Sequence, residues 1–170
     1  MGKGLVAHEP VYELKEIKRL ILLPPELRTE LRGEKPGSEF PGIGAASLVA
    51  EFLLGHTLKV SQKNRRGWKI RKGDQPDFER LEGYEEIWVL CLRKPGAGWR
   101  ISGRVLEPNV LVVLDICDKR DVDKDYKNVV ARVTAQWQQF LGDEKPHSGN
   151  WIDGYISGSH YDVDEKKQIG

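Results

Sequence analysis

The chain has 170 residues, of which 39 % are apolar and 31 % are charged, and its net charge is +1. This length suits one domain, and the composition favours a folded core with polar appendages over a disordered chain. The sequence contains no stretch of about 18 apolar residues, so no membrane-spanning helix is expected. Charge is unevenly distributed, because residues 56–106 contain 12 basic and 6 acidic side chains. This middle part is therefore the one suited to a polyanionic partner.

The first third of the chain predicts helices separated by loops. A flexible N-terminus is expected for residues 1–10, which are punctuated by Gly and Pro. Apolar residues at helical spacing, interrupted first by Pro24-Pro25 and then by a Gly- and Pro-rich loop, predict three helices. These helices are expected over residues 11–23, 25–32 and about 45–55.

A basic loop follows, from Asn64 to Asp74. It combines cationic side chains with an aromatic ring, and its members are Arg65, Arg66, Trp68, Lys69, Arg71 and Lys72. Cations can meet phosphates while a ring stacks on a base, so this composition favours nucleic-acid binding. The alternative is an exposed hairpin whose Trp68 packs on the core.

Three apolar runs then predict strands over 87–92, 99–106 and 110–117. The links between them are short and rich in turn residues, which favours an antiparallel meander. Apolar residues at helical spacing over 126–141 predict a helix that closes the domain on the sheet. The sequence therefore indicates an α+β fold built on a small antiparallel sheet.

Residues 142–170 read as a polar tail with interspersed aromatic residues, which lies on the domain or binds a partner. Cys91 and Cys117 both fall inside apolar runs and are expected to be buried thiols in a reducing cytosol. No trustworthy metal-ligand spacing, phosphate loop or serine nucleophile motif is present. The sequence thus predicts neither a metal nor a cofactor.

The segment from Ile87 to Leu141 resembles the RelE-type toxins of bacterial toxin–antitoxin systems, the RelE/ParE superfamily. The resemblance covers about a third of the chain. Its pieces, in chain order, are the strand IWVLCLR, Gly98-Trp99-Arg100, the strand WRISGRVL, the break Pro108-Asn109, the strand VLVVLDIC, the pair Lys119-Arg120, and Tyr126 opening the last helix. The resemblance implies a RelE-like domain over residues 11–141 with inserted loops, in which N-terminal helices and a C-terminal helix flank a small antiparallel sheet.

The same resemblance implies a cytoplasmic, metal-independent endoribonuclease that cuts mRNA on the ribosome and is neutralised by a cognate antitoxin. In such chemistry the 2′-hydroxyl attacks the adjacent phosphate, a proton must be taken up, and cations stabilise the developing charge. Arg100 and Arg120 are the candidates for phosphate stabilisation, and Lys119 is a candidate helper. Tyr126 is a candidate for proton transfer or base stacking. Contacts to RNA are expected from Arg93, Lys94 and Arg104.

Purely structural roles are the alternative for these residues. Arg100 and Arg120 also fit surface charge at strand ends, and Tyr126 also fits a packing residue at a helix start. Two further hypotheses remain for the whole chain. One is a non-catalytic module of the same fold that inhibits a protein partner such as gyrase. The other is an interaction protein of a phage or mobile element.

Overall fold

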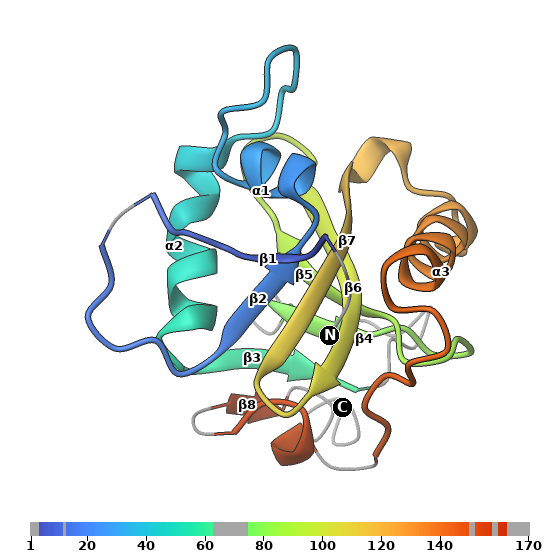
Figure 1. Ribbon diagram of the computed structural model, residues 1–170. Helices are drawn as coiled ribbons and strands as arrows, with labels where there is room; N and C mark the ends of the chain where they lie inside the picture. Colours follow the sequence, from blue (N-terminus) through green and yellow to red (C-terminus); the bar gives the residue numbers. More distant parts are fainter. Residues whose placement is uncertain (1–3, 12, 63–74, 150–151, 158–159, 163–170) are drawn as a thin grey trace.

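The computed structural model describes residues 4–11, 13–62, 75–149, 152–157 and 160–162. Within them, eight strands form one sheet in the order β1-β2-β7-β6-β5-β4-β3-β8 (Figure 1). The strands are β1 (Val6–Ala7), β2 (Leu20–Leu23), β3 (Leu58–Ser61), β4 (Phe78–Arg80), β5 (Trp88–Leu92), β6 (Trp99–Glu107), β7 (Val110–Asp118) and β8 (His160–Asp162). The helices are α1 (Pro25–Leu31), α2 (Gly42–Leu53) and α3 (Lys127–Leu141), with 3₁₀ turns η1 (Lys119–Asp121) and η2 (Ile152–Gly154).

The expected small antiparallel meander is wrong as a description of the fold, because the sheet is larger and mixed. Strands β5, β6 and β7 pair antiparallel with one another. However, β2 runs parallel to β7, and β3 runs parallel to both β4 and β8. Parallel pairs join segments that are distant in the sequence, so the local turn signals that favour a meander do not reveal them.

The helix predicted over residues 11–23 is also wrong. The last four of these residues form β2, which pairs in register from Leu20 opposite Val110 to Leu22 opposite Val112. A short apolar run fits a helix or a buried strand equally well by periodicity alone. Here the partner strand decides, and Pro24 ends β2 because proline cannot donate to the ladder.

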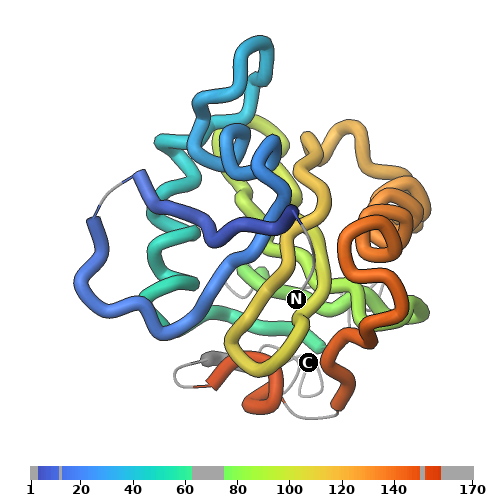
Figure 2. The backbone as a smooth tube through the Cα atoms, viewed as in Figure 1, coloured from blue at the N-terminus to red at the C-terminus, as the bar shows by residue number. Residues whose placement is uncertain are grey.

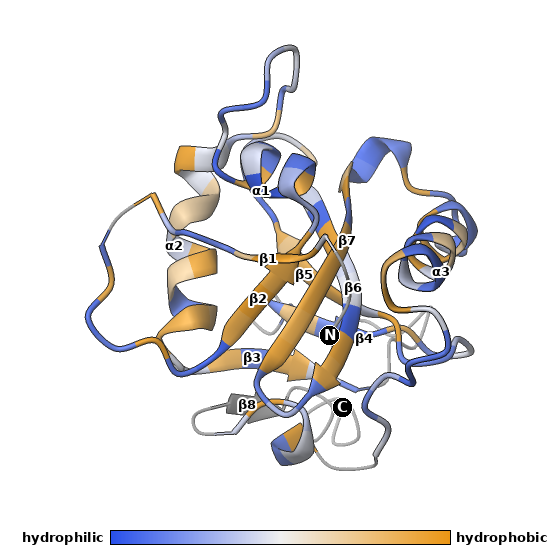
Figure 3. Cartoon of the chain, viewed as in Figure 1, coloured by the Kyte–Doolittle hydropathy of each residue, from blue (hydrophilic) through white to orange (hydrophobic). Residues whose placement is uncertain are grey.

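Helices cover both faces of the sheet. Helices α1 and α2 lie on one face and α3 lies on the other (Figure 1), so the central strands are apolar along most of their length (Figure 3). All five residues of β5 are buried. Packing on two faces explains why these strands read as continuous apolar runs instead of alternating ones.

The described part of the C-terminal tail is packed on the domain. After α3 the chain runs past the hairpin that joins β6 to β7 (Figure 2). His147 N donates to Val105 O at 2.7 Å, and Asn109 N donates to Tyr155 O at 2.8 Å. Tyr155 and Ile156 are fully buried in the core on the α2 face. This segment is therefore part of the folded core.

Candidate functional site

Arg100 and Tyr126, which are 26 positions apart in the chain, meet on the α3 side of the sheet. Arg100 lies on β6 and is 5 % exposed, and Tyr126 directly precedes α3 and is 9 % exposed. Arg100 Nε donates to Tyr126 Oη at 3.4 Å, and Nη1 donates to the carbonyl oxygens of Leu92 at 3.3 Å and Trp99 at 3.1 Å. The guanidinium is thus fixed in place by the strand ends around it.

A carboxylate and a thiol adjoin this pair. Cys91 on β5 lies directly opposite Arg100, and its Sγ donates to Glu79 Oε1 of β4 at 3.5 Å. Burial and the Glu79 carboxylate raise the pKa of Tyr126 to about 12, and the same two causes raise the pKa of the Cys91 thiol. Both groups therefore hold their protons at neutral pH, while Glu79 supplies a negative charge beside them.

Lys119 adds a second cation to the cluster. It begins the turn η1 after β7, and its Nζ lies 5.4 Å from the centroid of the Tyr126 ring. This distance is within the range of a cation–π contact. Three of the four residues predicted as catalytic, Arg100, Lys119 and Tyr126, are thus neighbours, together with Glu79. We refer to these four residues as the Arg100 cluster.

Arg120, the fourth predicted residue, is held away from this cluster. Its Nε and Nη2 donate to the two carboxylate oxygens of Asp118 at 3.1 and 2.7 Å, and its side chain is 71 % exposed. The bidentate pair occupies the edge of the guanidinium that would bind a phosphate. The guanidinium of Arg120 is therefore already paired with Asp118, two positions earlier in the chain.

Replacing Arg120 with alanine is expected to raise the pKa of Asp118. Hydrogen bonds from the Arg120 side chain and backbone hold that pKa at about 2. The pKa of Asp118 is lower in the folded protein than in the unfolded chain. The pairing with Arg120 therefore stabilises the folded protein fully above about pH 4, and this contribution is lost as the pH falls through about 2. An NMR titration of the Asp118 carboxyl should show it moving toward 3.8, and an unchanged midpoint would contradict the pairing.

The residues predicted to contact RNA have different outcomes. The basic loop, with Arg65, Arg66, Trp68, Lys69, Arg71 and Lys72, lies outside the described residues. Lys94 is exposed, while Arg93 is half-buried and its Nη2 donates to Pro76 O at 2.6 Å. Arg104 is 8 % exposed and lies 5.5 Å from the Trp137 ring of α3. Arg104 is therefore buried and packed against α3.

Sequence reasoning missed Glu79. It lies in a polar stretch that contains the turn residues Pro76 and Gly83, but Phe78–Arg80 forms the three-residue strand β4. Glu79 is opposite Val89 in the β4–β5 ladder. Val89 is two residues from Cys91, and both side chains lie on the α3 face of the sheet, so Glu79 also faces α3. A three-residue strand is too short to show periodicity, and only the pairing with β5 reveals the carboxylate's position.

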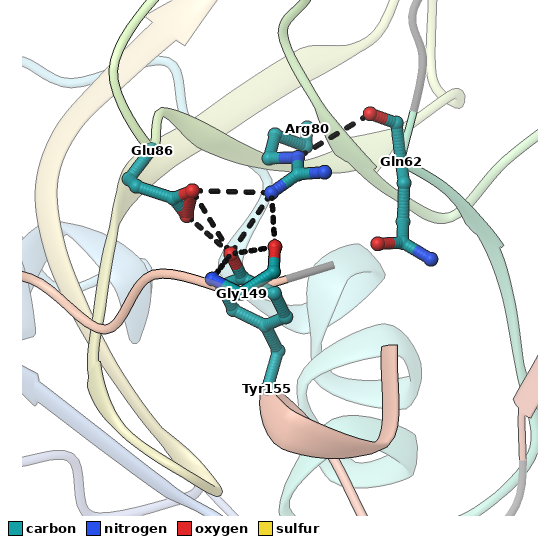
Figure 4. Close-up of polar contacts among 5 residues, drawn as sticks. All are labelled: Gln62, Arg80, Glu86, Gly149 and Tyr155. Carbon is teal, nitrogen blue, oxygen red and sulfur yellow. Dashed lines mark hydrogen bonds and ion pairs between the residues drawn. The ribbon is translucent and has the colours of Figure 1, made fainter. Parts of the chain in front are cut away.

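A second polar cluster lies on the opposite face of the sheet (Figure 4). Tyr155 Oη donates to Glu86 Oε2 at 2.6 Å, and Arg80 Nη1 donates to Glu86 Oε1 at 3.1 Å. Arg80 Nη1 also donates to Gly149 O at 3.1 Å, while Arg80 Nε donates to Gln62 O at 3.3 Å. The donors and acceptors of this network form hydrogen bonds with one another, so the network attaches the tail to the sheet.

Replacing Glu86 with alanine is expected to lower the free energy of unfolding by about 3 kcal/mol, because a largely buried guanidinium and the Tyr155 hydroxyl lose their carboxylate and keep only uncharged acceptors, among them the backbone carbonyl of Gly149. Chemical denaturation measures this loss. The matched control is Glu85→Ala, since Glu85 is adjacent in the chain and exposed. Equal stabilities of the two variants would show that the network contributes little.

An open groove lies beside α3. It has a volume of about 710 Å³ and runs between the first turn of α1 and the side of α3 that carries Arg132 and Phe140. The floor is Leu114 and Asp115 of β7, and Asp115 Oδ1 accepts from Arg132 Nε at 2.7 Å. The lining of the groove mixes apolar side chains with this ion pair and with the polar residues Glu26, Gln136 and Gln139.

Comparisons with known proteins found no matching family model, no similar curated protein and no similar solved structure. Among the residues that the structure describes, no helix is long and apolar enough to cross a membrane.

Proposed function

We propose that this chain is a toxin of a toxin–antitoxin system, a cytoplasmic RelE-like endoribonuclease that cleaves mRNA through attack of the 2′-hydroxyl. The antitoxin and the ribosome with its mRNA are the proposed partners. The observation that carries this proposal is the contact between Arg100 and Tyr126, with Lys119 and Glu79 beside it. A proton acceptor, a proton donor and two cations are the parts that metal-independent cleavage requires.

Arg100 is the residue we assign to the scissile phosphate. Its Nε and Nη1 are engaged, but Nη2 has no hydrogen-bond partner among the described residues. A fixed guanidinium with open donors can stabilise the two oxygens on which charge develops. Lys119 contributes a second positive charge to the same phosphate.

Tyr126 is the residue we assign to the leaving oxygen. A guanidinium only donates, so Tyr126 Oη accepts from Arg100 and its own hydrogen is left to donate elsewhere. Its raised pKa keeps the phenol protonated throughout the neutral range. A protonated phenol next to a phosphate-binding arginine is suited to act as a general acid.

Glu79 is the residue we assign to the attacking hydroxyl. In the proposed step its carboxylate takes the 2′-hydroxyl proton as the 2′-oxygen forms a bond to phosphorus. The bond from phosphorus to the 5′-oxygen breaks, and that oxygen takes the proton of Tyr126. The products are a 2′,3′-cyclic phosphate and a 5′-hydroxyl. Glu79 then releases its proton to solvent, and the Tyr126 phenolate recovers one from solvent.

Primer-extension mapping of mRNA ends after induction tests this proposal. The expected result is a set of discrete new 5′ ends that carry hydroxyl groups, with 2′,3′-cyclic phosphates at the 3′ ends of the upstream fragments. Growth arrest with intact mRNA would overturn it.

A non-catalytic binding module is the second candidate, and the groove between α1 and α3 favours it. In this case the protein inhibits a protein partner, of which gyrase is one example. Expression of the double variant Arg100→Ala, Arg120→Ala separates the two. Growth arrest that persists in the double variant would support the binding module and exclude the ribonuclease.

A further inference from the structure

Tyr126 is held in a strained backbone conformation. Its φ of 56° and ψ of 16° lie in the left-handed region, which a bulky side chain rarely adopts. Such a conformation is strained and persists only where its surroundings fix it. The contacts around Tyr126 therefore determine where its hydroxyl lies.

The loop before α3 fixes its own shape. Asp123 N donates to Asn128 Oδ1 and Asn128 N donates to Asp123 Oδ2, both at 3.1 Å. Asn128 Nδ2 also donates to Asp121 O at 2.6 Å, and Tyr126 N donates to Asp123 O at 3.0 Å. All of these contacts lie between residues 121 and 128. They define the turn but do not attach it to the strands beneath.

Tyr84 supplies an attachment to the sheet. It lies in the connection between β4 and β5, 41 positions from the loop, and its hydroxyl donates to Asp125 O at 2.5 Å. That carbonyl belongs to the peptide group that joins Asp125 to Tyr126. Tyr84 is partly buried against the core on the α3 side, so its ring is itself held in place.

We infer that Tyr84 is a positioning residue, which places the hydroxyl of Tyr126 over Arg100 through the peptide group between Asp125 and Tyr126. This role rests on the proposed ribonuclease function. Tyr84 touches neither the substrate nor the reacting atoms. It acts by limiting how far the strained Tyr126 can move from the bond-breaking position, where an error of about 1 Å is enough to cost a large factor in rate.

The variant Tyr84→Phe tests this role, because it removes the hydroxyl and keeps the ring. The kcat for RNA cleavage is expected to fall about tenfold, with KM unchanged, since the phosphate site at Arg100 is intact. The affinity for RNA with 2′-O-methyl groups, which cannot be cleaved, should also be unchanged. NMR titration with carbon-13-labelled tyrosine should show the pKa of Tyr126 falling from about 12 toward its usual value as the ring becomes more exposed.

The control is Tyr155→Phe, which makes the same chemical change in the network on the opposite face. It should lower stability and leave kcat and the titration of Tyr126 unchanged. If the wild type cleaves RNA and Tyr84→Phe cleaves at the same rate, the positioning role is overturned. If the wild type cleaves no RNA, the proposed function fails, and an unchanged Tyr126 titration in Tyr84→Phe then overturns the positioning role as well.

Discussion

Replacing Arg100 with alanine is expected to lower the rate of RNA cleavage by about 10²- to 10³-fold, because it removes a fixed cation from the developing phosphate charge. The guanidinium is 5 % exposed and bound by Tyr126 and two strand carbonyls, so it is held in place before substrate binds. A preorganised donor in a water-poor site contributes far more than an exposed one. Single-turnover kinetics on an RNA oligonucleotide bound to ribosomes measures the loss.

Two further arginine variants distinguish chemistry from folding. Arg19 is 1 % exposed and its Nη1 donates to Phe52 O at 3.3 Å, remote from the Arg100 cluster. Arg19→Ala should therefore destabilise the protein without changing the cleavage step of the folded fraction. Arg120→Ala should have a smaller effect than Arg100→Ala, since Asp118 already occupies that guanidinium. Cleavage by folded Arg100→Ala at the wild-type rate would refute the assignment of Arg100.

Replacing Tyr126 with phenylalanine is expected to lower kcat by about 10²-fold and to leave RNA affinity unchanged, because it removes the proton donor but keeps the ring. Wild-type kcat should not fall between about pH 7 and 10, since a phenol with a pKa of about 12 stays protonated over that range. Rates measured on the same oligonucleotide across this pH range check both statements.

A substrate whose leaving atom needs no proton provides the control for Tyr126. In an RNA with sulfur in place of the 5′-bridging oxygen, the leaving thiolate needs no proton. The difference between the wild type and Tyr126→Phe should then largely disappear. An equal difference on both substrates would show that Tyr126 does not act as the general acid.

The parts of the fold that have local signals could be predicted from the sequence. Strands β5, β6 and β7 were predicted within one or two residues, because apolar runs alternate with turn residues such as Pro95 and Asn109. Helices α1, α2 and α3 were predicted at nearly their observed positions from apolar spacing, with prolines and glycines at their ends. Arg100, Lys119 and Tyr126 were singled out through the resemblance of their segment to RelE-type toxins.

The way in which these elements combine depends on pairing between distant segments. Strand β2 pairs with β7 across 90 positions, and Phe78–Arg80 becomes a strand because β5 lies beside it. Such partners are too far apart in the chain for periodicity to reveal them. The neighbours of Arg100 could not be predicted for the same reason. Glu79 on β4 comes near Arg100 on β6 because β5 pairs with both strands. Arg120 is held away because its side chain pairs with Asp118. Residue types follow from sequence, but which charges meet depends on strand register and on the packing of α3.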